Sequence, residues 1–411
     1  MSKSERILAR DHRVISPSLT RDLSVVFQKG RGCYIWDADG KKYLDFAASV
    51  AVNGVGNCNP AVARAITRQL RDGIHCGFSD FYADIPVKFV ERLLGFMPGF
   101  DKAFLSNSGT ESVEAAYKMA RWHSDRKWVI AFEGAFHGRT MGSLSMTKSK
   151  PVQRERFDPF LPVVHVPYPY AFRMKMEPEE CSQYCLSLLE DRMAAMRDDL
   201  AALFLEPIQG EGGYVVPPAS FVRGVRKLCD TYGVLLCDDE VQAGCFRTGK
   251  FLAIENFGVR PDIVTLSKAL GGGMPIGATV SRNDIMDWPP GSHANTLGGN
   301  LLACAAGIAT LDYMKKKKLG ENAARVGAFM LREFEKLKGD VLVDVRGIGL
   351  MIGLEIKDAE IRNRIVQSAS RKGLILLPAG EAVVRICPPL TITKAQALEG
   401  IGTICECIEE V

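Results

Sequence analysis

The stretch Thr265-Leu266-Ser267-Lys268-Ala269-Leu270-Gly271-Gly272-Gly273 places one lysine between an apolar run and three consecutive glycines. The apolar residues Ile263–Leu266 predict a buried strand, and the glycines allow the backbone to turn tightly beneath a bound group. A lysine at the end of such a strand can have a lowered pKa, so its amine can act as a nucleophile and as a proton shuttle. A lysine before glycines is more often an ordinary loop charge, so the meaning of Lys268 depends on the rest of the chain.

Three acidic residues follow another apolar run upstream of Lys268. Val234–Cys237 predicts a strand, and Asp238, Asp239 and Glu240 come directly after it, where open α/β sheets bind ligands. A helix cap and surface charge would explain one or two of these acids, but a buried carboxylate needs a cationic partner. A lysine Schiff base combined with an acid on a protonated ring nitrogen is the pattern of pyridoxal 5′-phosphate enzymes.

A phosphate-binding turn is the next requirement of such a cofactor, and Ser106–Glu111 provides a candidate. It opens the predicted helix Thr110–His123, so free N–H groups and the positive end of the helix dipole would face an anion. A plain helix cap is the alternative interpretation. Further on, Gly134–Thr140 offers Phe136 to stack on a flat ring and Arg139 to hold a carboxylate. The alternative for this segment is a glycine-rich loop with a core phenylalanine and a surface arginine.

The centre of the chain alternates short apolar runs with helical patterns, which predicts α/β units around a mostly parallel sheet. The expected strands are Lys102–Ser106, Trp128–Phe132, Leu200–Leu205, Val234–Cys237 and Ile263–Leu266. The two ends of the chain differ from the centre, because their strands alternate or form hairpins. The expected elements there are the hairpin Gly32–Phe46, the strands within Leu342–Ile356, the helix Ile361–Lys372 and the strand Val383–Ile386.

These patterns predict a large α/β domain over residues 61–304 and a small α/β domain built from both termini, residues 1–60 and 305–411. A long helix from about Gly299 to Lys316 would join the two. One misleading motif lies in the small domain, where the glycine spacing of Arg346–Gly353 is similar to that of a dinucleotide-binding motif. The residues that follow are strand-like rather than helical, so we interpret its glycines as sites of close strand packing.

Composition excludes several functional classes. The formal net charge is +4 with no basic stripe interleaved with aromatic residues, so we expect no nucleic-acid partner. The twelve cysteines contain no C-x-x-C pair or Cys/His cluster, so we expect reduced thiols and no metal site. The N-terminus lacks a signal-peptide pattern and no apolar run is long enough to span a membrane, so we expect a cytoplasmic protein.

Six motifs, in this order along the chain, resemble those of the class-III (ω-) aminotransferases of pyridoxal phosphate fold type I. They are Ser108–Glu111, Ala135–Thr140, Glu206–Gly213, Asp239–Gln242, Lys268 with its glycines, and Gly291–Thr296. The resemblance runs from about Gly32 to the C-terminus. It implies a mostly parallel, seven-stranded-type sheet between helices in the large domain, and a homodimer with shared active sites.

The resemblance implies a role for each residue at the cofactor. Lys268 would carry pyridoxal phosphate as a Schiff base and move the proton, and Asp239 would keep the ring nitrogen protonated. The other expected cofactor contacts are Gln242 at the phenolic oxygen, Phe136 stacked on the ring, His137 nearby, Gly109 and Thr110 at the phosphate, and Thr296 at the phosphate of the neighbouring subunit.

The resemblance also implies the substrate contacts. Arg385 would bind an α-carboxylate, and Glu211 would neutralise this arginine when the substrate carries none, because an unpaired buried arginine is costly. Arg139 would hold the distal carboxylate. Val50, among small apolar residues, and Glu206 complete the expected substrate site.

The resemblance is strongest to the 4-aminobutyrate aminotransferase branch. It implies transfer of an amino group from a ω-amino acid to 2-oxoglutarate by ping-pong chemistry through Lys268. Two alternatives with the same cofactor remain open: an amino-acid racemase or epimerase of the same subgroup, and an acetylornithine- or ornithine-type transaminase. A cofactor-free relative with a structural role is disfavoured, because Lys268, Asp239 and Gln242 are all present.

Overall fold

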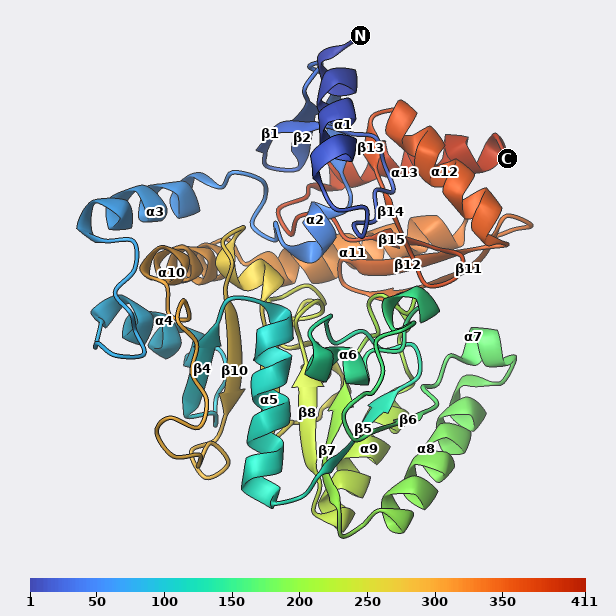
Figure 1. Ribbon diagram of the computed structural model, residues 1–411. Helices are drawn as coiled ribbons and strands as arrows, with labels where there is room; N and C mark the ends of the chain where they lie inside the picture. Colours follow the sequence, from blue (N-terminus) through green and yellow to red (C-terminus); the bar gives the residue numbers. More distant parts are fainter.

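The structure, a computed structural model, describes residues 1–411 and is built around a central seven-stranded sheet (Figure 1). In spatial order its strands are β4 (Lys102–Ser106), β10 (Gly277–Ser281), β9 (Ile263–Leu266), β8 (Leu235–Asp239), β7 (Leu200–Leu205), β5 (Trp128–Phe132) and β6 (Val163–Val166). Only β10 runs antiparallel to its neighbours, and the other pairings are parallel. The predicted α/β fold with a mostly parallel seven-stranded sheet is therefore confirmed.

Both faces of this sheet are apolar, which explains why its strands lack polar alternation. Phe204, Cys237 and Ile263 belong to the cluster that packs on α5 (Gly109–Ser124). Their neighbours on the strands point to the other face and join the cluster that contains α8 (Pro178–Ala195) and α9 (Ala219–Tyr232). Successive side chains of a strand point to opposite faces. Asp239 therefore shares the α5 face with Cys237, and Asp238 lies on the α9 face.

The remaining helices surround the sheet and the terminal segments. They are α1 (Lys3–Val14), α2 (Ala48–Ala51), α3 (Pro60–Asp72), α4 (Asp84–Leu94), α6 (Met141–Met146), α7 (Ala171–Met174), α10 (Leu301–Lys316), α11 (Leu319–Glu335), α12 (Ala359–Arg371) and α13 (Lys394–Glu409). Three 3₁₀ turns complete the set, namely η1 (Pro151–Gln153), η2 (Ala253–Phe257) and η3 (Lys268–Gly271). None of the helices combines the length and apolar character that a membrane crossing requires.

Two four-stranded sheets lie above the central one in Figure 1 and join the two ends of the chain. The first has the order β1 (Phe27–Arg31), β2 (Tyr34–Asp37), β3 (Lys42–Asp45) and β13 (Leu374–Ile375). The second has the order β11 (Leu342–Ile348), β12 (Met351–Ile356), β15 (Val383–Ile386) and β14 (Leu377–Ala379). Because β3 pairs with β13, the small α/β layer contains both termini, as expected, and α10 is the long helix predicted near residues 299–316. The domain boundaries at residues 60 and 304 stay a prediction.

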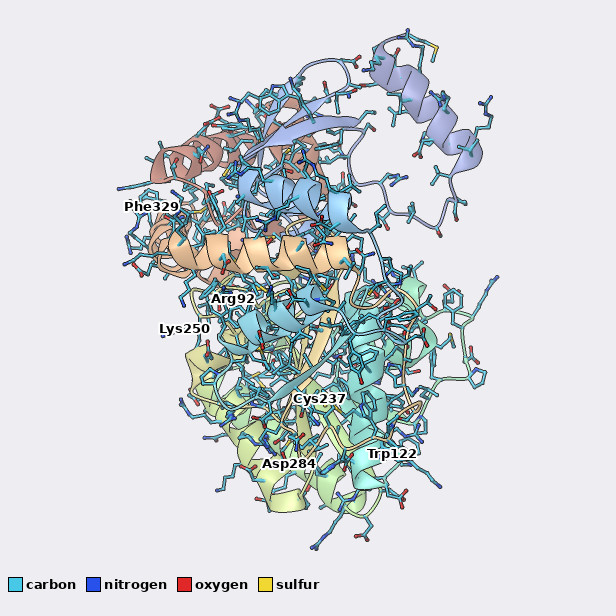
Figure 2. The ribbon with its side chains drawn as sticks, turned by 90° about the vertical axis from the view of Figure 1, so that its left-hand side faces the viewer. Arg92, Trp122, Cys237, Lys250, Asp284 and Phe329 are labelled. Atoms are coloured by element: carbon cyan, nitrogen blue, oxygen red, sulfur yellow. The ribbon has the colours of Figure 1, made fainter.

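The sequence analysis did not name strands β6 and β10, and two further features of the fold also differ from it. Strand β8 continues to Asp239 rather than ending at Cys237, because it pairs with β9 as far as Thr265. Helix α1 is stabilised locally by a capping box between Ser2 and Glu5 and has no buried residue. Figure 2 shows this helix set apart from the rest of the protein.

Candidate active site

A cavity of about 280 Å³ lies where β4, β5, β8 and β9 end in the central sheet. This edge is where open parallel sheets bind ligands. The cavity contains all the predicted cofactor residues except Thr296. They are Gly109, Thr110, Phe136, His137, Asp239, Gln242 and Lys268.

The N-terminus of α5 forms one wall of this smaller cavity. Ser108 caps the helix by accepting a hydrogen bond from the Glu111 backbone, and Gly109 comes next. A β-carbon at Gly109 would lie 2.7 Å from a Val241 methyl group, so only glycine fits against this neighbour. The Thr110 hydroxyl lies 2.5 Å from that of Ser143. This helix end offers free N–H groups, a hydroxyl and a positive dipole to an anion.

A buried hydrogen bond joins two residues that line the smaller cavity. His137 Nδ1 lies 2.7 Å from Asp239 Oδ2, and both side chains are almost fully buried. The second oxygen of Asp239 accepts hydrogen bonds from the Val241 backbone and the Thr265 hydroxyl. Burial alone would lower the pKa of His137, but the hydrogen bond to Asp239 and its charge raise it. His137 therefore positions Asp239, a contact between residues far apart in sequence that no motif indicated.

Lys268 stands at the end of β9 and lines both this cavity and a larger one beside it. Its backbone has a φ of 39°, a left-handed conformation that is uncommon for a non-glycine residue and is maintained by the surrounding fold. Its amine forms no ion pair, and burial lowers its pKa. A lysine amine with a lowered pKa is suited to nucleophilic attack and proton transfer.

Two further polar side chains line the smaller cavity. The Gln242 side-chain oxygen is buried without a hydrogen-bond partner. Both carboxylate oxygens of Glu206 are occupied, since one accepts from the Phe136 backbone and the other from the Gly210 backbone. Burial raises the pKa of Glu206 to about 7. Glu206 thus lines the smaller cavity, as Arg139 also does, but it does not reach the larger cavity where the other predicted substrate residues lie.

Those other substrate residues meet at the larger cavity, which measures about 660 Å³. Glu211 and Arg385 are directly paired there, and Val50 and Arg139 also line it. Burial would raise the pKa of Glu211, but the charge of Arg385 lowers it, so the Glu211 carboxylate stays ionised. Val50 lies in a left-handed turn, with a φ of 57°.

The sequence analysis missed the N-terminal residues that line the larger cavity. They are Leu19, Thr20, Arg21, Asp22, Leu23, Val25 and Phe27, with Ile375 and Leu377 from the C-terminal segment. These segments carry no motif, and only the tertiary structure brings them to the site.

Comparison with known proteins assigns the chain to a family, and this assignment agrees with the geometry of the two cavities. The model of the family "Aminotransferase class-III" matches residues 15–408. The chain belongs to the class-III aminotransferase family. It is 38% identical to an acetylornithine aminotransferase of Methanosarcina acetivorans, covering 100% of this chain and 97% of the relative. It is 36% identical to a leucine/methionine racemase of Thermococcus litoralis, covering 100% of this chain and 96% of that relative.

Solved structures agree with the family assignment. The ornithine aminotransferase of Toxoplasma gondii superposes with a TM-score of 0.91 at 30% identity, covering 100% of this chain and 96% of that one. The predicted family and fold are therefore confirmed. The expected placement in the 4-aminobutyrate branch is not supported, because these relatives are acetylornithine and ornithine enzymes and a racemase.

Class-III aminotransferases use pyridoxal phosphate, and the smaller cavity fits this cofactor. The α5 N-terminus, with Gly109 and Thr110 lining the cavity, suits its phosphate. Asp239 suits a protonated ring nitrogen, and Gln242 lines the cavity, where its amide N–H can donate to the ring oxygen. The unpaired amine of Lys268 suits the Schiff base.

Thr296 is the predicted cofactor residue that the structure does not bring to this site. It is exposed on the loop before α10, and its backbone carbonyl lies 2.9 Å from His75 Nε2. Its expected contact with a partner subunit's phosphate stays a prediction.

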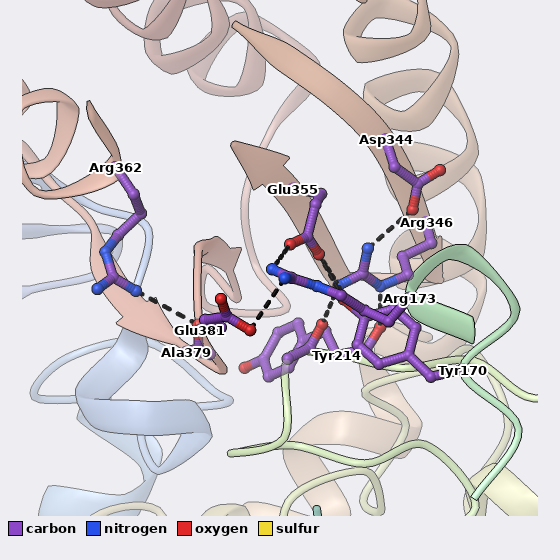
Figure 3. Close-up of polar contacts among 10 residues, drawn as sticks. Tyr170, Arg173, Tyr214, Asp344, Arg346, Glu355, Arg362, Ala379 and Glu381 are labelled. Atoms are coloured by element: carbon purple, nitrogen blue, oxygen red, sulfur yellow. Dashed lines mark hydrogen bonds and ion pairs between the residues drawn. The ribbon is translucent and has the colours of Figure 1, made fainter. Parts of the chain in front are cut away.

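A buried ion network holds the loop of Glu211 against the sheet that carries Arg385 (Figure 3). Glu355 on β12 is paired with both Arg173 and Arg346 and accepts a hydrogen bond from the Tyr170 hydroxyl. Arg346 also donates to the backbone carbonyls of Gly213 and Tyr214, which follow Glu211 closely in sequence. The glycine-rich segment after Arg346 is part of the β11–β12 hairpin, so it is not a dinucleotide site.

Replacing Glu355 with glutamine should lower the free energy of unfolding by up to about 3 kcal/mol, because Arg173 and Arg346 lose the buried carboxylate that they share and keep only more exposed acidic partners. Urea unfolding followed by circular dichroism measures this change. Glu381→Gln is the matched control, since Glu381 pairs with the same Arg173 but its side chain is 77% exposed. The control should change stability by less than about 1 kcal/mol. Equal effects of the two substitutions would contradict the assigned role of burial.

Proposed function

We propose that this protein is a pyridoxal phosphate-dependent aminotransferase that moves the terminal amine of an acylated ornithine, of the acetylornithine type, to 2-oxoglutarate. The observation that carries the proposal is the ion pair between Glu211 and Arg385 in the larger cavity, beside Lys268. A terminal amine has no carboxylate next to the reacting carbon, so Glu211 can remain on Arg385 while that substrate is bound. Glutamate has such a carboxylate, and Arg385 can bind it once Glu211 moves away.

The protein's own residues carry out the proton transfer, stabilise the cofactor and hold the substrate. When bound, pyridoxal phosphate supplies an electron sink that stabilises the negative charge left by proton removal. Lys268 removes and returns this proton, because its amine faces both cavities and burial favours its neutral form. Asp239, held by His137, supplies the negative charge below the cofactor, and Arg139 holds the distal carboxylate of the substrate.

Two observations support an acylated ornithine over 4-aminobutyrate as the substrate. The larger cavity of about 660 Å³ exceeds what a four-carbon acid needs, and the apolar part of its mixed lining suits a longer acylated chain. The acetylornithine aminotransferase relatives, 38% identical over the whole chain, support the same substrate class. We also propose a cytoplasmic homodimer, in which Thr296 reaches the phosphate of the partner's cofactor.

A racemase acting on an apolar amino acid is the second candidate. The apolar wall formed by Leu19, Leu23, Val25 and Phe27 favours it, since this wall would suit a leucine or methionine side chain. The relative from Thermococcus litoralis supports the same candidate. Transamination has priority because the Glu211–Arg385 pair serves a glutamate half-reaction and has no evident use in racemisation.

The decisive experiment compares amine donors with the purified holoenzyme. N-acetylornithine, L-ornithine and 4-aminobutyrate are each supplied with 2-oxoglutarate, and glutamate formation is measured. The highest kcat/KM is expected for N-acetylornithine. A higher value for 4-aminobutyrate would overturn the proposed substrate. Loss of optical activity from L-leucine or L-methionine without an oxo acid, with no glutamate formed from any donor, would establish the racemase.

A further inference from the structure

Lys150 lies beside the ion pair of the larger cavity, next to the Glu211 oxygen that Arg385 does not bind. It immediately precedes η1, and its side chain lines the cavity. Its amine lies 3.8 Å from Glu211 Oε2, whereas Arg385 binds Oε1. The two oxygens of one carboxylate therefore face two different cations.

This arrangement reduces the free-energy cost of the step in which Arg385 leaves Glu211 to bind a substrate carboxylate. The Glu211 side chain is only 16% exposed, so it would become a poorly solvated, unpaired anion when Arg385 turns to a substrate carboxylate. Leaving one partner of a buried pair without its counter-ion is strongly unfavourable. A cation that stays near Glu211 during this step lowers the free energy of the state in which glutamate is bound.

Lys150 is the cation available for this task. Lys268 also lies near Glu211 and contributes to its low pKa, but its amine is needed for the reaction. Lys148, two residues before Lys150, is paired with Glu133 at 2.7 Å and lines neither cavity. Lys150 has no carboxylate partner other than Glu211.

We infer that Lys150 is the second counter-ion of Glu211 and holds its carboxylate while Arg385 binds the α-carboxylate of glutamate or 2-oxoglutarate. Lys150 is thus a positioning residue that favours one of the two half-reactions. The inference rests on the proposed function, because it requires a glutamate half-reaction.

The test measures the two half-reactions separately on the holoenzyme, by the change in cofactor absorbance after mixing with L-glutamate or with N-acetylornithine. Lys150→Met should raise the KM for glutamate about tenfold, the effect of losing one charge-assisted contact. The KM and rate for N-acetylornithine should change less than about twofold, because Glu211 stays on Arg385 with this substrate. Lys150→Arg should restore the glutamate KM. Lys148→Met is the matched control and should leave both half-reactions unchanged.

The outcomes separate this inference from the proposed function. If Lys150→Met weakens both half-reactions equally, Lys150 serves the pocket in general, and the inference is wrong. If the unaltered protein transaminates and Lys150→Met behaves like it in both half-reactions, the inference alone is overturned. If the unaltered protein shows no half-reaction with glutamate, the proposed function and the inference fall together.

Discussion

Replacing Lys268 with alanine should abolish turnover while leaving the fold intact. The amine of Lys268 is the group at the junction of the two cavities that can form the Schiff base and move the proton. Alanine removes both functions and adds no bulk. Because alanine still has a β-carbon, the backbone strain at this positive φ stays, so the substitution should not change the fold. Glutamate formation from N-acetylornithine and 2-oxoglutarate measures the loss, and the thermal unfolding midpoint checks the fold.

A lysine on the surface provides the control for this substitution. Lys316, near the end of α10, is exposed and forms no ion pair, so Lys316→Ala should retain full activity. Turnover by Lys268→Ala in the absence of any added amine would refute the assignment of Lys268 as the Schiff-base lysine.

Replacing Asp239 with asparagine should reduce turnover by about two to four orders of magnitude. Asparagine keeps the shape of the side chain but removes its negative charge, which the proposed role requires under a protonated ring nitrogen. Loss of one partner from a buried charge pair costs about 3–5 kcal/mol, and 1.36 kcal/mol corresponds to a factor of ten in rate. Steady-state kinetics with saturating cofactor measures the effect.

Asp238→Asn is a closely matched control for this prediction. Asp238 precedes Asp239 on the same strand, but it lies on the opposite face of the sheet and lines neither cavity. Burial and the nearby carboxyl of Glu240 raise the pKa of Asp238 well above its usual value, so asparagine resembles its protonated form. The control should lose little activity. Similar losses in the two variants would mean that the charge of Asp239 has no special role.

The same two aspartates illustrate the limit of prediction from sequence. The apolar run before them predicted a strand whose end carries the chemistry, and the structure confirms that strand as β8. The apolar pattern of the strand did not reveal which acid faces the site, because a strand buried on both faces has no polar alternation to mark its sides, and only the family resemblance indicated Asp239. The packing of Cys237 against α5 and of Leu236 against the α9 side decides this.

The residues that could be predicted share a local cause. Lys268 stands between a strand and glycines, and Gly109 opens a helix directly after a strand, so neighbouring residues in the sequence define each environment. His137 illustrates the opposite case, since its partner Asp239 lies 102 positions away in the chain. No local pattern indicates such a pair, and it forms only when the ends of β5 and β8 meet at one edge of the sheet.

The sequence by itself determined the family, the cofactor and five of the seven strands of the central sheet, because these depend on motifs and on short-range apolar patterns. The tertiary structure decided which face each acid occupies, which residues cover the larger cavity and which cations surround Glu211. These features depend on contacts between segments distant in sequence, such as Lys150, Glu211 and Arg385. Such contacts arise from how sheets and loops pack, and packing is a property of the whole fold.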